Sequence, residues 1–326
     1  MATLAFAWEL GLGSGYCGLI ARIARTAVAA GHRCDFIVRD LHIARRHIPA
    51  ELGRLVQAPQ AGERSGSPVA VQTSYATLLH NCGFDDADDL DARVGAWQAL
   101  FRLLGSDRLL ARHSPTAILA ARLTGLPTLH YGSGFSIPPA TTPWPSFRPD
   151  LQLPDNALRH NEERVLDVVN AVRKRRGCGD WPQASALFED LPTALLGDAD
   201  TDHYHHPRSD PFVGLPDLSH GDAPVWPETG SGPRLFVSLP PAATDWLSLL
   251  ADLPASCLVR FLGPATIPRE LPGNVRITRT PVNFGQAIAS ADAVLGYGSH
   301  NLVYEALVAG RQKWTRFVRQ FSRFHK

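Results

Sequence analysis

The first forty residues alternate between apolar runs and one amphipathic stretch. Residues 3–8 form a short apolar run that predicts a strand, and residues 36–38 form a second run of the kind that parallel sheets bury on both faces. Residues 19–30 repeat apolar side chains at helical spacing, and Gly31 is placed to cap that helix. A glycine-rich loop at 9–18 joins strand and helix. The pattern predicts a β-α-β unit opening a doubly wound domain.

The alternation continues over the rest of the chain. We expect strands at 54–58 and near 116–120, a helix over 94–104 and a long helix over 155–176. A polar stretch rich in Pro, Gly and Asp then precedes a second series of elements. In that series the pattern predicts strands at 235–239, 258–261, 275–278 and 293–296, with helices near Trp246 and Ala287 and from Glu305 onward.

Two successive series of strand-helix alternation predict two domains of one class. The expected fold is α/β, with two Rossmann-like domains facing a cleft. We place the first domain at residues 1–205, a linker at 206–233, and a partial second domain at 234–326 that ends in a basic tail over 311–326. Ligands of open α/β sheets lie beyond the carboxyl ends of the strands, so the functional residues are expected there.

Composition and charge narrow the class of protein. The 326 residues carry a formal net charge of +1 and are 44% hydrophobic, which is ordinary for a globular chain and too balanced for a broad nucleic-acid-binding face. The five cysteines are scattered without a C-x-x-C pair, which favours free thiols in a reducing compartment. The apolar start lacks a basic region and is interrupted by Glu9, so no targeting segment is indicated and we expect a cytoplasmic protein.

The first glycine loop has two interpretations. Gly13, Gly15 and Gly18 follow a strand and precede a helix, which matches the G-x-G-x-x-G fingerprint of dinucleotide-binding folds. Asp35 or Asp40, about 20 residues on, would then hold the ribose of NAD(P), and the protein would be an oxidoreductase. In the other interpretation the glycines only allow a turn with positive φ.

A second glycine-bearing loop points to a diphosphate. Tyr297, Gly298, Ser299, His300 and Asn301 lie between a strand and a helix, so backbone amides at the helix start would face an anionic group. Further along that helix, the carboxylate of Glu305 has the spacing to hold ribose hydroxyls. The alternative is a capped helix with a surface glutamate.

Four segments together resemble a known family. They are residues 8–41, the run Asp202-His203-Tyr204, the run Val225-Trp226-Pro227, and residues 298–310 with Glu305-Ala306-Leu307. They look like bacterial GT-B glycosyltransferases related to the UDP-glycosyltransferases of small lipophilic acceptors. The resemblance implies an acceptor-binding first domain, with Gly13 and Gly15 in its loop, and a second domain that binds the UDP-sugar.

The same resemblance assigns the chemistry. It implies inverting transfer to a small-molecule hydroxyl without a metal or a cofactor other than the nucleotide sugar. Gly298, Ser299, His300 and Asn301 would bind the diphosphate, and Glu305 would bind the ribose. Where the family has a histidine as general base this chain has Tyr16, a weak base at neutral pH, and we propose His113 as the fallback base.

The chain departs from the family after Gly310. A strand and a loop that bind the donor sugar are expected there, and the chain instead turns basic and aromatic and stops at Lys326, as a truncation or frameshift would produce. One alternative is therefore a degenerate relative that binds a nucleotide or hydrophobic ligand without turnover. The tail at 313–326 also has the pattern of a basic amphipathic helix, for which contact with a membrane surface is an alternative to packing on the protein.

Overall fold

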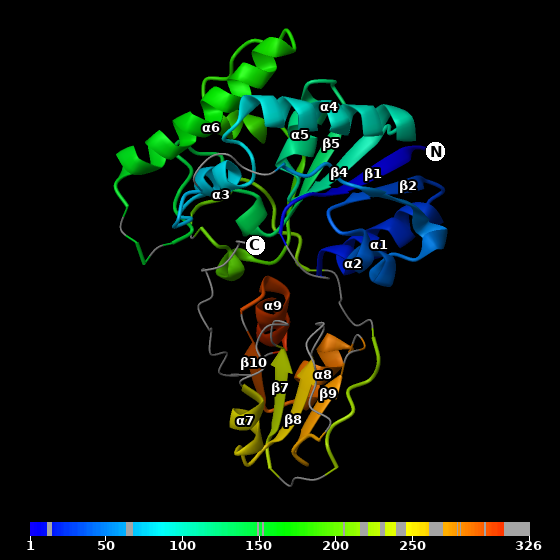
Figure 1. Cartoon of the computed structure of the whole chain (residues 1–326). Coiled ribbons are helices and arrows are strands. Elements are labelled where there is room, and N and C mark those ends of the chain that lie inside the picture. Colours follow the sequence, from blue (N-terminus) through cyan, green and yellow to red (C-terminus); the bar gives the residue numbers. More distant parts are fainter. Residues whose placement is uncertain are drawn as a thin grey trace. The chain divides into compact units, whose positions relative to one another are not determined.

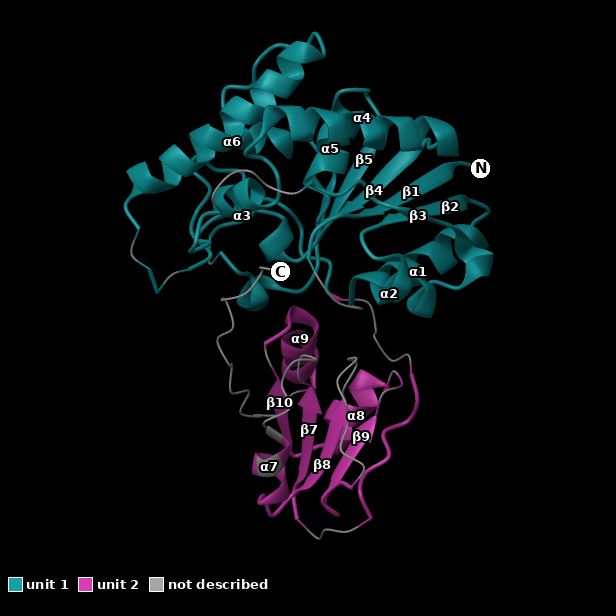
Figure 2. Ribbon diagram, in the orientation of Figure 1, with its two compact units in different colours: residues 1–214 teal, residues 215–326 magenta. Residues whose placement is uncertain are grey.

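The computed structural model describes residues 1–11, 15–62, 68–148, 150–151, 153–204, 206–215, 221–228, 232–238, 246–260, 270–278, 280, 282–296 and 298–309. The chain divides into two compact units, Met1–Gly214 and Leu215–Lys326 (Figure 2). The division falls inside the stretch at 206–233 that the sequence marks as a linker. Both units are α/β, as the alternation of apolar patterns predicts.

Unit 1 contains one parallel sheet of six strands in the order β3-β2-β1-β4-β5-β6 (Figure 1). The strands are β1 (Thr3–Trp8), β2 (Arg33–Val38), β3 (Gly53–Gln57), β4 (Arg108–Arg112), β5 (Thr128–Gly132) and β6 (Thr193–Leu195). Strand β1 is central and wholly buried, with Ala5 opposite both Asp35 and Leu109. Its apolar run and its bounds are those predicted.

Helices cover both faces of this sheet. Figure 1 shows α1 and α2 on one face and α4, α5 and α6 on the other. Their bounds are α1 (Gly15–Ala29), α2 (Leu41–His47), α3 (Tyr75–Asn81), α4 (Ala87–Leu104), α5 (Pro115–Arg122) and α6 (Asp155–Arg175). Buried side chains of α3 to α6 pack on Ala5, Ala7, Leu109 and Ala111 of the sheet. The small alanines of β1 and β4 let the helices lie close to the strands.

One predicted strand is wrong. Residues 116–120 were expected as a strand near the middle of the domain and are instead the centre of α5. All residues from Pro115 to Ala121 are buried, so the segment shows no polar face and its apolar run does not distinguish a buried helix from a buried strand. Pro115 at the first turn is a helix-start signal that decides the matter.

Helix α1 begins at Gly15, four residues earlier than its apolar pattern predicts, and ends as predicted. Gly31 has a φ of +83°, and the His32 amide donates to the Ala27 carbonyl, which is the geometry of a glycine-capped helix end. The early start matters for the site, because it places Tyr16 in the first turn of the helix.

Unit 2 contains a parallel sheet of four strands in the order β10-β7-β8-β9. The strands are β7 (Arg234–Ser238), β8 (Ser256–Arg260), β9 (Val275–Thr278) and β10 (Ala293–Gly296), and the helices are α7 (Trp246–Ala251), α8 (Phe284–Ser290) and α9 (His300–Val308). All four strands lie where the sequence predicts them, within two residues. Phe236, Leu258, Ile288 and Leu302 form the centre of one of its cores.

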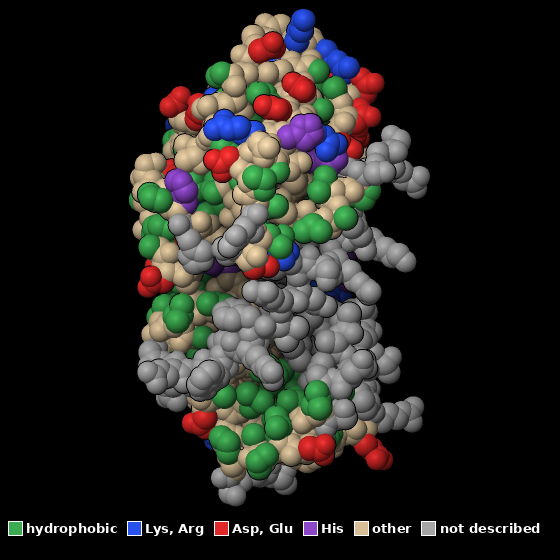
Figure 3. Space-filling view, turned by 90° about the vertical axis from the view of Figure 1, so that its left-hand side faces the viewer, with side chains coloured by type: hydrophobic (Ala, Val, Ile, Leu, Met, Phe, Trp, Pro, Cys, Tyr) green, Lys and Arg blue, Asp and Glu red, His purple; other side chains and the backbone are tan. Residues whose placement is uncertain are grey.

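Three findings concern the surface and the chain's end. No helix among the described residues is long and apolar enough to cross a bilayer. On the face drawn in Figure 3, acidic and basic side chains are interspersed and gather into no basic patch among the described residues. The tail at 311–326 lies outside the described residues, so its helix and its membrane contact stay predictions.

Candidate functional site

Each sheet has a point where the strand order reverses direction. In unit 1 the chain moves outward from β1 to β2 and β3, then returns to place β4 on the other side of β1. In unit 2 it moves from β7 to β8 and β9, then returns with β10 beside β7. Loops on either side of such a point diverge at the carboxyl ends of the strands and leave a crevice where ligands of this fold class bind. The predicted site residues follow three of the strands at these points, β1, β4 and β10.

Tyr16 and His113 meet at the reversal point of unit 1. Tyr16 lies in the first turn of α1, after β1, and His113 follows β4 directly. The Tyr16 hydroxyl and the His113 Nδ1 are 3.3 Å apart and form a hydrogen bond. The two residues are 97 positions apart, and the parallel pairing of β1 with β4 brings them together.

The backbone at His113 holds an unusual conformation. Its φ is +49°, and among the described residues the other non-glycine residue with positive φ is Asp190. The Leu10 amide donates to the His113 carbonyl at 2.9 Å, so the loop after β1 is tied to the residue after β4. A left-handed conformation at a bulky residue is the kind of local strain that folds retain at functional positions.

Arg112 fixes the start of α1 against β4. Its guanidinium donates to the carbonyl oxygens of Gly15 and Tyr16, at 3.3 and 3.1 Å, and its central carbon lies 4.7 Å from the centre of the Tyr16 ring. The arginine side chain is buried. A buried cation therefore stacks on the phenol ring, which holds the ring in place and makes its surroundings electropositive.

His113 is a neutral imidazole at physiological pH. Burial, together with smaller contributions from His130, Arg112 and Arg39, lowers its pKa to about 3. The residue is 2% exposed, and its Nε2 has no hydrogen-bond partner within the described part of the chain. His113 is thus a weak base, and through Nδ1 it serves as an acceptor for the Tyr16 hydroxyl, provided Nε2 carries the proton.

Aromatic rings surround the pair. His113 lies 6.1 Å from the Tyr75 ring and 5.8 Å from the Phe135 ring, and Phe135 in turn lies 5.5 Å from His203. Tyr75 is fully buried, whereas Tyr16, Phe135 and His203 are partly exposed. Tyr16, Phe135 and His203 thus belong to a row of aromatic contacts that runs through buried His113.

A buried ion pair that the sequence analysis did not identify supports this site. Glu9, directly after β1, accepts from the Thr116 amide at 3.0 Å and lies 3.4 Å from Arg93 on α4. Burial raises the pKa of Glu9, while Arg93 acts in the opposite direction. The carboxylate at the start of α5 also interacts favourably with the helix dipole. Glu9 therefore anchors the loop that leads to Tyr16.

A second buried pair fixes the segment around His203. Arg208 donates twice to Asp202, at 2.8 Å in each case, and once to the Ile137 carbonyl at 2.8 Å. The Asp202 carboxylate is therefore held by Arg208 within the protein's own structure. Among the described residues no group of three or more His, Cys, Asp or Glu has the geometry of a metal site.

The dinucleotide interpretation of the first glycine loop finds little support in the described residues. Gly15 is the first residue of α1, while Gly13 lies outside the described residues. Asp35 forms a two-point ion pair with Arg54, at 2.6 and 2.9 Å, and Asp40 caps α2 by accepting from the Ile43 amide. Both candidate ribose ligands are engaged in the protein's own structure.

The predicted donor-binding residues lie at the reversal point of unit 2. Strand β10 ends at Gly296 beside Ser238 at the end of β7, and Gly298, with a φ of +80°, turns the chain into α9. Tyr297 lies outside the described residues. Ser299 is the N-cap of α9 and makes no side-chain cap hydrogen bond, in contrast to Asn283, which caps α8. The first amides of α9 are therefore not capped by that side chain and remain suited to an anion.

One side of α9 is buried through Leu302 and Ala306. The residues predicted to bind the donor are not on this buried side. His300, Asn301 and Glu305 are partly exposed, and the His300 ring stacks on Tyr304 at 6.4 Å. A side chain on Gly296 would clash with Leu302, so the glycine lets α9 pack closely against the end of β10. The helix start is thereby held at the carboxyl ends of the strands.

Comparison with solved structures identifies the architecture. No protein-family model matches the chain, and no curated protein sequence matches it. The fold matches that of the glycosyltransferase VinC in complex with DTDP, with a TM-score of 0.61, 13% identity, and coverage of 97% of this chain and 81% of that one. This chain has the GT-B fold.

Other GT-B glycosyltransferases give similar values. The calicheamicin glycosyltransferase CalG4 matches with a TM-score of 0.60 and 18% identity over 95% of this chain and 77% of its own. SnogD from Streptomyces nogalater matches with a TM-score of 0.57 and 18% identity over 98% and 82%. The two-Rossmann-domain fold expected from the sequence is confirmed, while at these identities the likeness establishes the fold alone.

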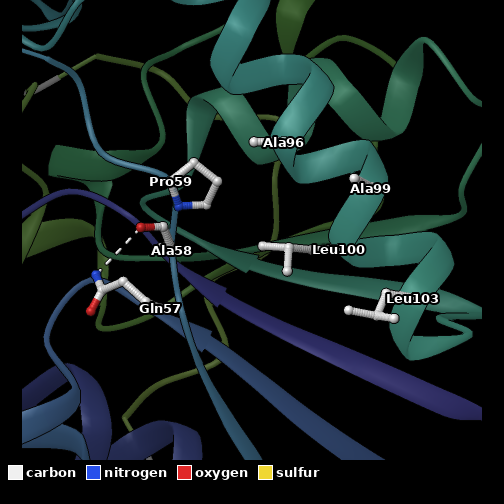
Figure 4. A pocket seen from close by; sticks show the side chains of 7 residues that line it. All are labelled: Gln57, Ala58, Pro59, Ala96, Ala99, Leu100 and Leu103. Atoms are coloured by element: carbon white, nitrogen blue, oxygen red, sulfur yellow. Dashed lines mark hydrogen bonds between the residues drawn. The ribbon is translucent and has the colours of Figure 1, made fainter.

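Among the described residues of this GT-B chain, a groove lies away from the predicted site residues. An open groove of about 640 Å³ lies between the residues after β3 and helix α4, lined by Gln57, Ala58, Pro59, Ala96, Ala99, Leu100 and Leu103 (Figure 4). The Gln57 amide donates to the Arg39 carbonyl at 2.7 Å. None of the lining side chains is ionisable, so the groove offers no acid-base chemistry.

Proposed function

We propose that this chain is an inverting glycosyltransferase that transfers a sugar from a nucleoside diphosphate sugar to a hydroxyl of a small-molecule acceptor. The observation that carries the proposal is the position of the predicted site residues. In both units of the GT-B fold, these residues lie at the point where the strand order of the sheet reverses, which is where ligands of this fold class bind. The nucleotide is a UDP or a dTDP group, the latter because the VinC structure holds DTDP.

The donor is assigned to unit 2. Amides of Gly298, Ser299 and the first turn of α9 would bind the diphosphate, and the positive end of the helix dipole would stabilise its charge as it leaves. His300 and Asn301 add side-chain donors, and Glu305 would accept from the ribose hydroxyls. Neither a metal nor a further cofactor enters this proposal.

The acceptor is assigned to unit 1. The Tyr16 hydroxyl, held by His113 and Arg112, would bind the acceptor hydroxyl and direct it at the anomeric carbon. Orientation of this kind contributes to catalysis without a strong base, because it removes much of the entropy of bringing two reactants together. His113 acts here as a positioning residue for Tyr16.

A second function is favoured by one observation. The low pKa of His113 removes the predicted fallback base, as expected of a relative that binds ligands without turnover. Both functions predict nucleotide binding, and only the first predicts transfer.

Calorimetry on the full chain tests the donor assignment. We expect UDP or dTDP to bind and NADH not to bind. Glu305→Gln is expected to weaken nucleotide affinity by about tenfold, the effect of one lost charge-assisted hydrogen bond. Glu228→Gln, at an exposed position of the same unit, is the matched control and is expected to bind as the parent does. Binding of NADH in place of the nucleoside diphosphates would replace the transferase with an oxidoreductase.

A further inference from the structure

Helix α4 carries a second apolar side besides the one that it buries in the core of unit 1. This second side consists of four residues at the spacing of one helical stripe, which are exposed Ala96, Ala99 and Leu103 and half-buried Leu100. Leu103 is 77% exposed, more than any other leucine in the described part of the chain. Apolar side chains gathered in one patch, unlike scattered single ones, indicate a surface that another molecule covers.

The stripe forms one wall of the groove in Figure 4, and the chain after β3 forms the other wall. This chain segment runs antiparallel to α4. The Arg54 guanidinium donates to the Leu104 carbonyl at the end of the helix, and the Gly62 amide donates to Asp89 at its start, both at 3.3 Å. Strand β3 is the edge of the six-stranded sheet. The groove therefore opens beside a sheet edge, and its volume of about 640 Å³ has room for apolar side chains of a partner.

The order of residue sizes along the stripe points to a second copy of this chain as that partner. Two alanines come first and two leucines follow. When two copies of α4 lie antiparallel about an axis between Ala99 and Leu100, Leu103 faces Ala96 of the second copy and Leu100 faces its Ala99. Large side chains then meet small ones across the contact, which lets two helices pack closely. A parallel pair would place leucine on leucine and leave gaps at the alanines.

Charges at the two ends of α4 favour the same arrangement. The helix begins with Asp86, Asp88 and Asp89 and has Arg102 in its last turn. The Asp88 side chain is 87% exposed although Arg175 contacts it at 2.7 Å, and Arg102 is exposed as well. An antiparallel pair places the acidic start of each helix toward the basic end of the other, whereas a parallel pair would place like charges together. An apolar centre with a charged rim is the usual composition of a protein interface.

We propose that this face of unit 1 joins two copies of the chain into a symmetric dimer, in which α4 packs antiparallel on its counterpart and Leu103 enters the groove of the other copy. Both copies use the same residues, as a two-fold interface requires. The inference is independent of the proposed glycosyltransferase function, because none of these residues is among the predicted site residues. One helix face beside one strand edge is small compared with the roughly 800 Å² per partner of a standard interface, so we expect a reversible dimer with a micromolar dissociation constant.

Sedimentation equilibrium of the full-length chain measures the association. We expect the average mass to rise from one copy toward two between about 1 and 100 µM protein. Leu103→Glu would place a charge from each copy in an apolar groove and is expected to raise the dissociation constant about a hundredfold or more. Leu249→Glu, on α7 of unit 2, is the matched control, because that leucine is 69% exposed, and it is expected to leave the constant unchanged. A parent chain that stays monomeric at about 100 µM would overturn the proposal.

Disulfide formation between two variants tests the antiparallel register. In the proposed dimer the cysteine of Ala96→Cys in one copy faces that of Leu103→Cys in the other, so an equal mixture of the two variants is expected to oxidise to a covalent heterodimer. Either variant alone is expected to form little covalent dimer, because its two cysteines lie about 10 Å apart along the helix axes. The parent chain, whose own cysteines are buried or half-buried, sets the background. Equal yields from the mixture and from each variant alone would contradict the antiparallel arrangement.

A chain shortened to end at residue 310 separates a second copy from another possible occupant of the groove, the chain's own tail at 311–326. The proposal predicts that the parent and the shortened chain dimerise with the same dissociation constant, and that Leu103→Glu weakens both. A monomeric parent together with a shortened chain that dimerises through Leu103 would assign the groove to the tail and overturn the proposal.

Discussion

His113 shows how strongly burial changes what one side chain can do. From the sequence it is the histidine available after Arg112, with the ordinary pKa of 6.5 that makes the residue a general base. In the structure, burial lowers that pKa to about 3, and the same holds for His130. The position of a histidine along the chain does not reveal its burial, so the sequence identified the residue and could not predict its chemistry.

Both buried histidines link stability to pH. They stay neutral in the folded state down to about pH 3, while in the unfolded state each takes up a proton near pH 6.5. The unfolded state thus binds more protons between these values, so stability is full above pH 6.5 and falls as the pH is lowered. We expect a loss of up to about 1.4 kcal/mol per pH unit from each histidine in that range.

Urea unfolding at pH 7.5, 6.5, 5.5 and 4.5, followed by tryptophan fluorescence, measures this slope. His113→Gln removes one of the two titrating groups and is expected to make the slope shallower. His160→Gln, at an exposed position of α6, serves as the control and is expected to leave the slope unchanged. A slope that His113→Gln leaves unchanged would mean that the imidazole is not buried as a neutral group.

At the scale of elements, the apolar pattern predicts most strands and fails where an element is buried all round. Strand β1 and the four strands of unit 2 follow their apolar runs closely. The pattern predicts a strand in place of helix α5, because all residues of this helix up to Ala121 are buried and no polar face reveals the helical repeat. The three-residue strand β6 is too short to leave any pattern at all.

The contact between α4 and the loop after β1 gives an element-scale prediction. Arg93 on α4 is buried and donates to Thr116 Oγ1 at 2.9 Å, to the Gly83 carbonyl and to Asp89. Arg93→Met would leave Glu9 buried without its cation, and the loss of one partner of a buried pair costs about 3–5 kcal/mol. Urea unfolding is expected to show a loss of about 3 kcal/mol for this variant. Arg102→Met, on the exposed side of α4, should change stability by about 0.5 kcal/mol or less.

At the scale of the whole molecule, the sequence predicts the fold class, while contacts between distant residues cannot be predicted from it. Tyr16 and His113 are predicted as alternative bases of one site, but the hydrogen bond between them depends on β4, a strand that the sequence analysis does not predict. Glu9 was noted only as a charge in an apolar segment, and its role depends on Arg93, 84 positions away. Long-range contacts of this kind come from topology and leave no local signal.

The division into units predicts that unit 1 folds alone. Among the described residues, its six strands pair with one another and, through Leu195, with Phe212 of the same unit, and its core is built from its own helices. A fragment of residues 1–214 is therefore expected to unfold cooperatively in urea and to keep the near-ultraviolet circular dichroism of Trp97 and Trp144, both fully buried. A fragment without a cooperative transition would show that the units depend on each other for folding.

The central claim is that the start of α9 binds a nucleoside diphosphate, and amide chemical shifts test it most directly. In the full chain labelled with ¹⁵N, titration with UDP or dTDP is predicted to shift the amides of Ser299, His300 and Asn301. Gly298→Val, which forces a branched side chain into a φ of +80°, should abolish the shifts. Gly177→Val, at a φ of +73° in unit 1, carries similar strain and should keep them. Unmoved α9 amides, with shifts in Gly15 to Gly18 instead, would contradict the account.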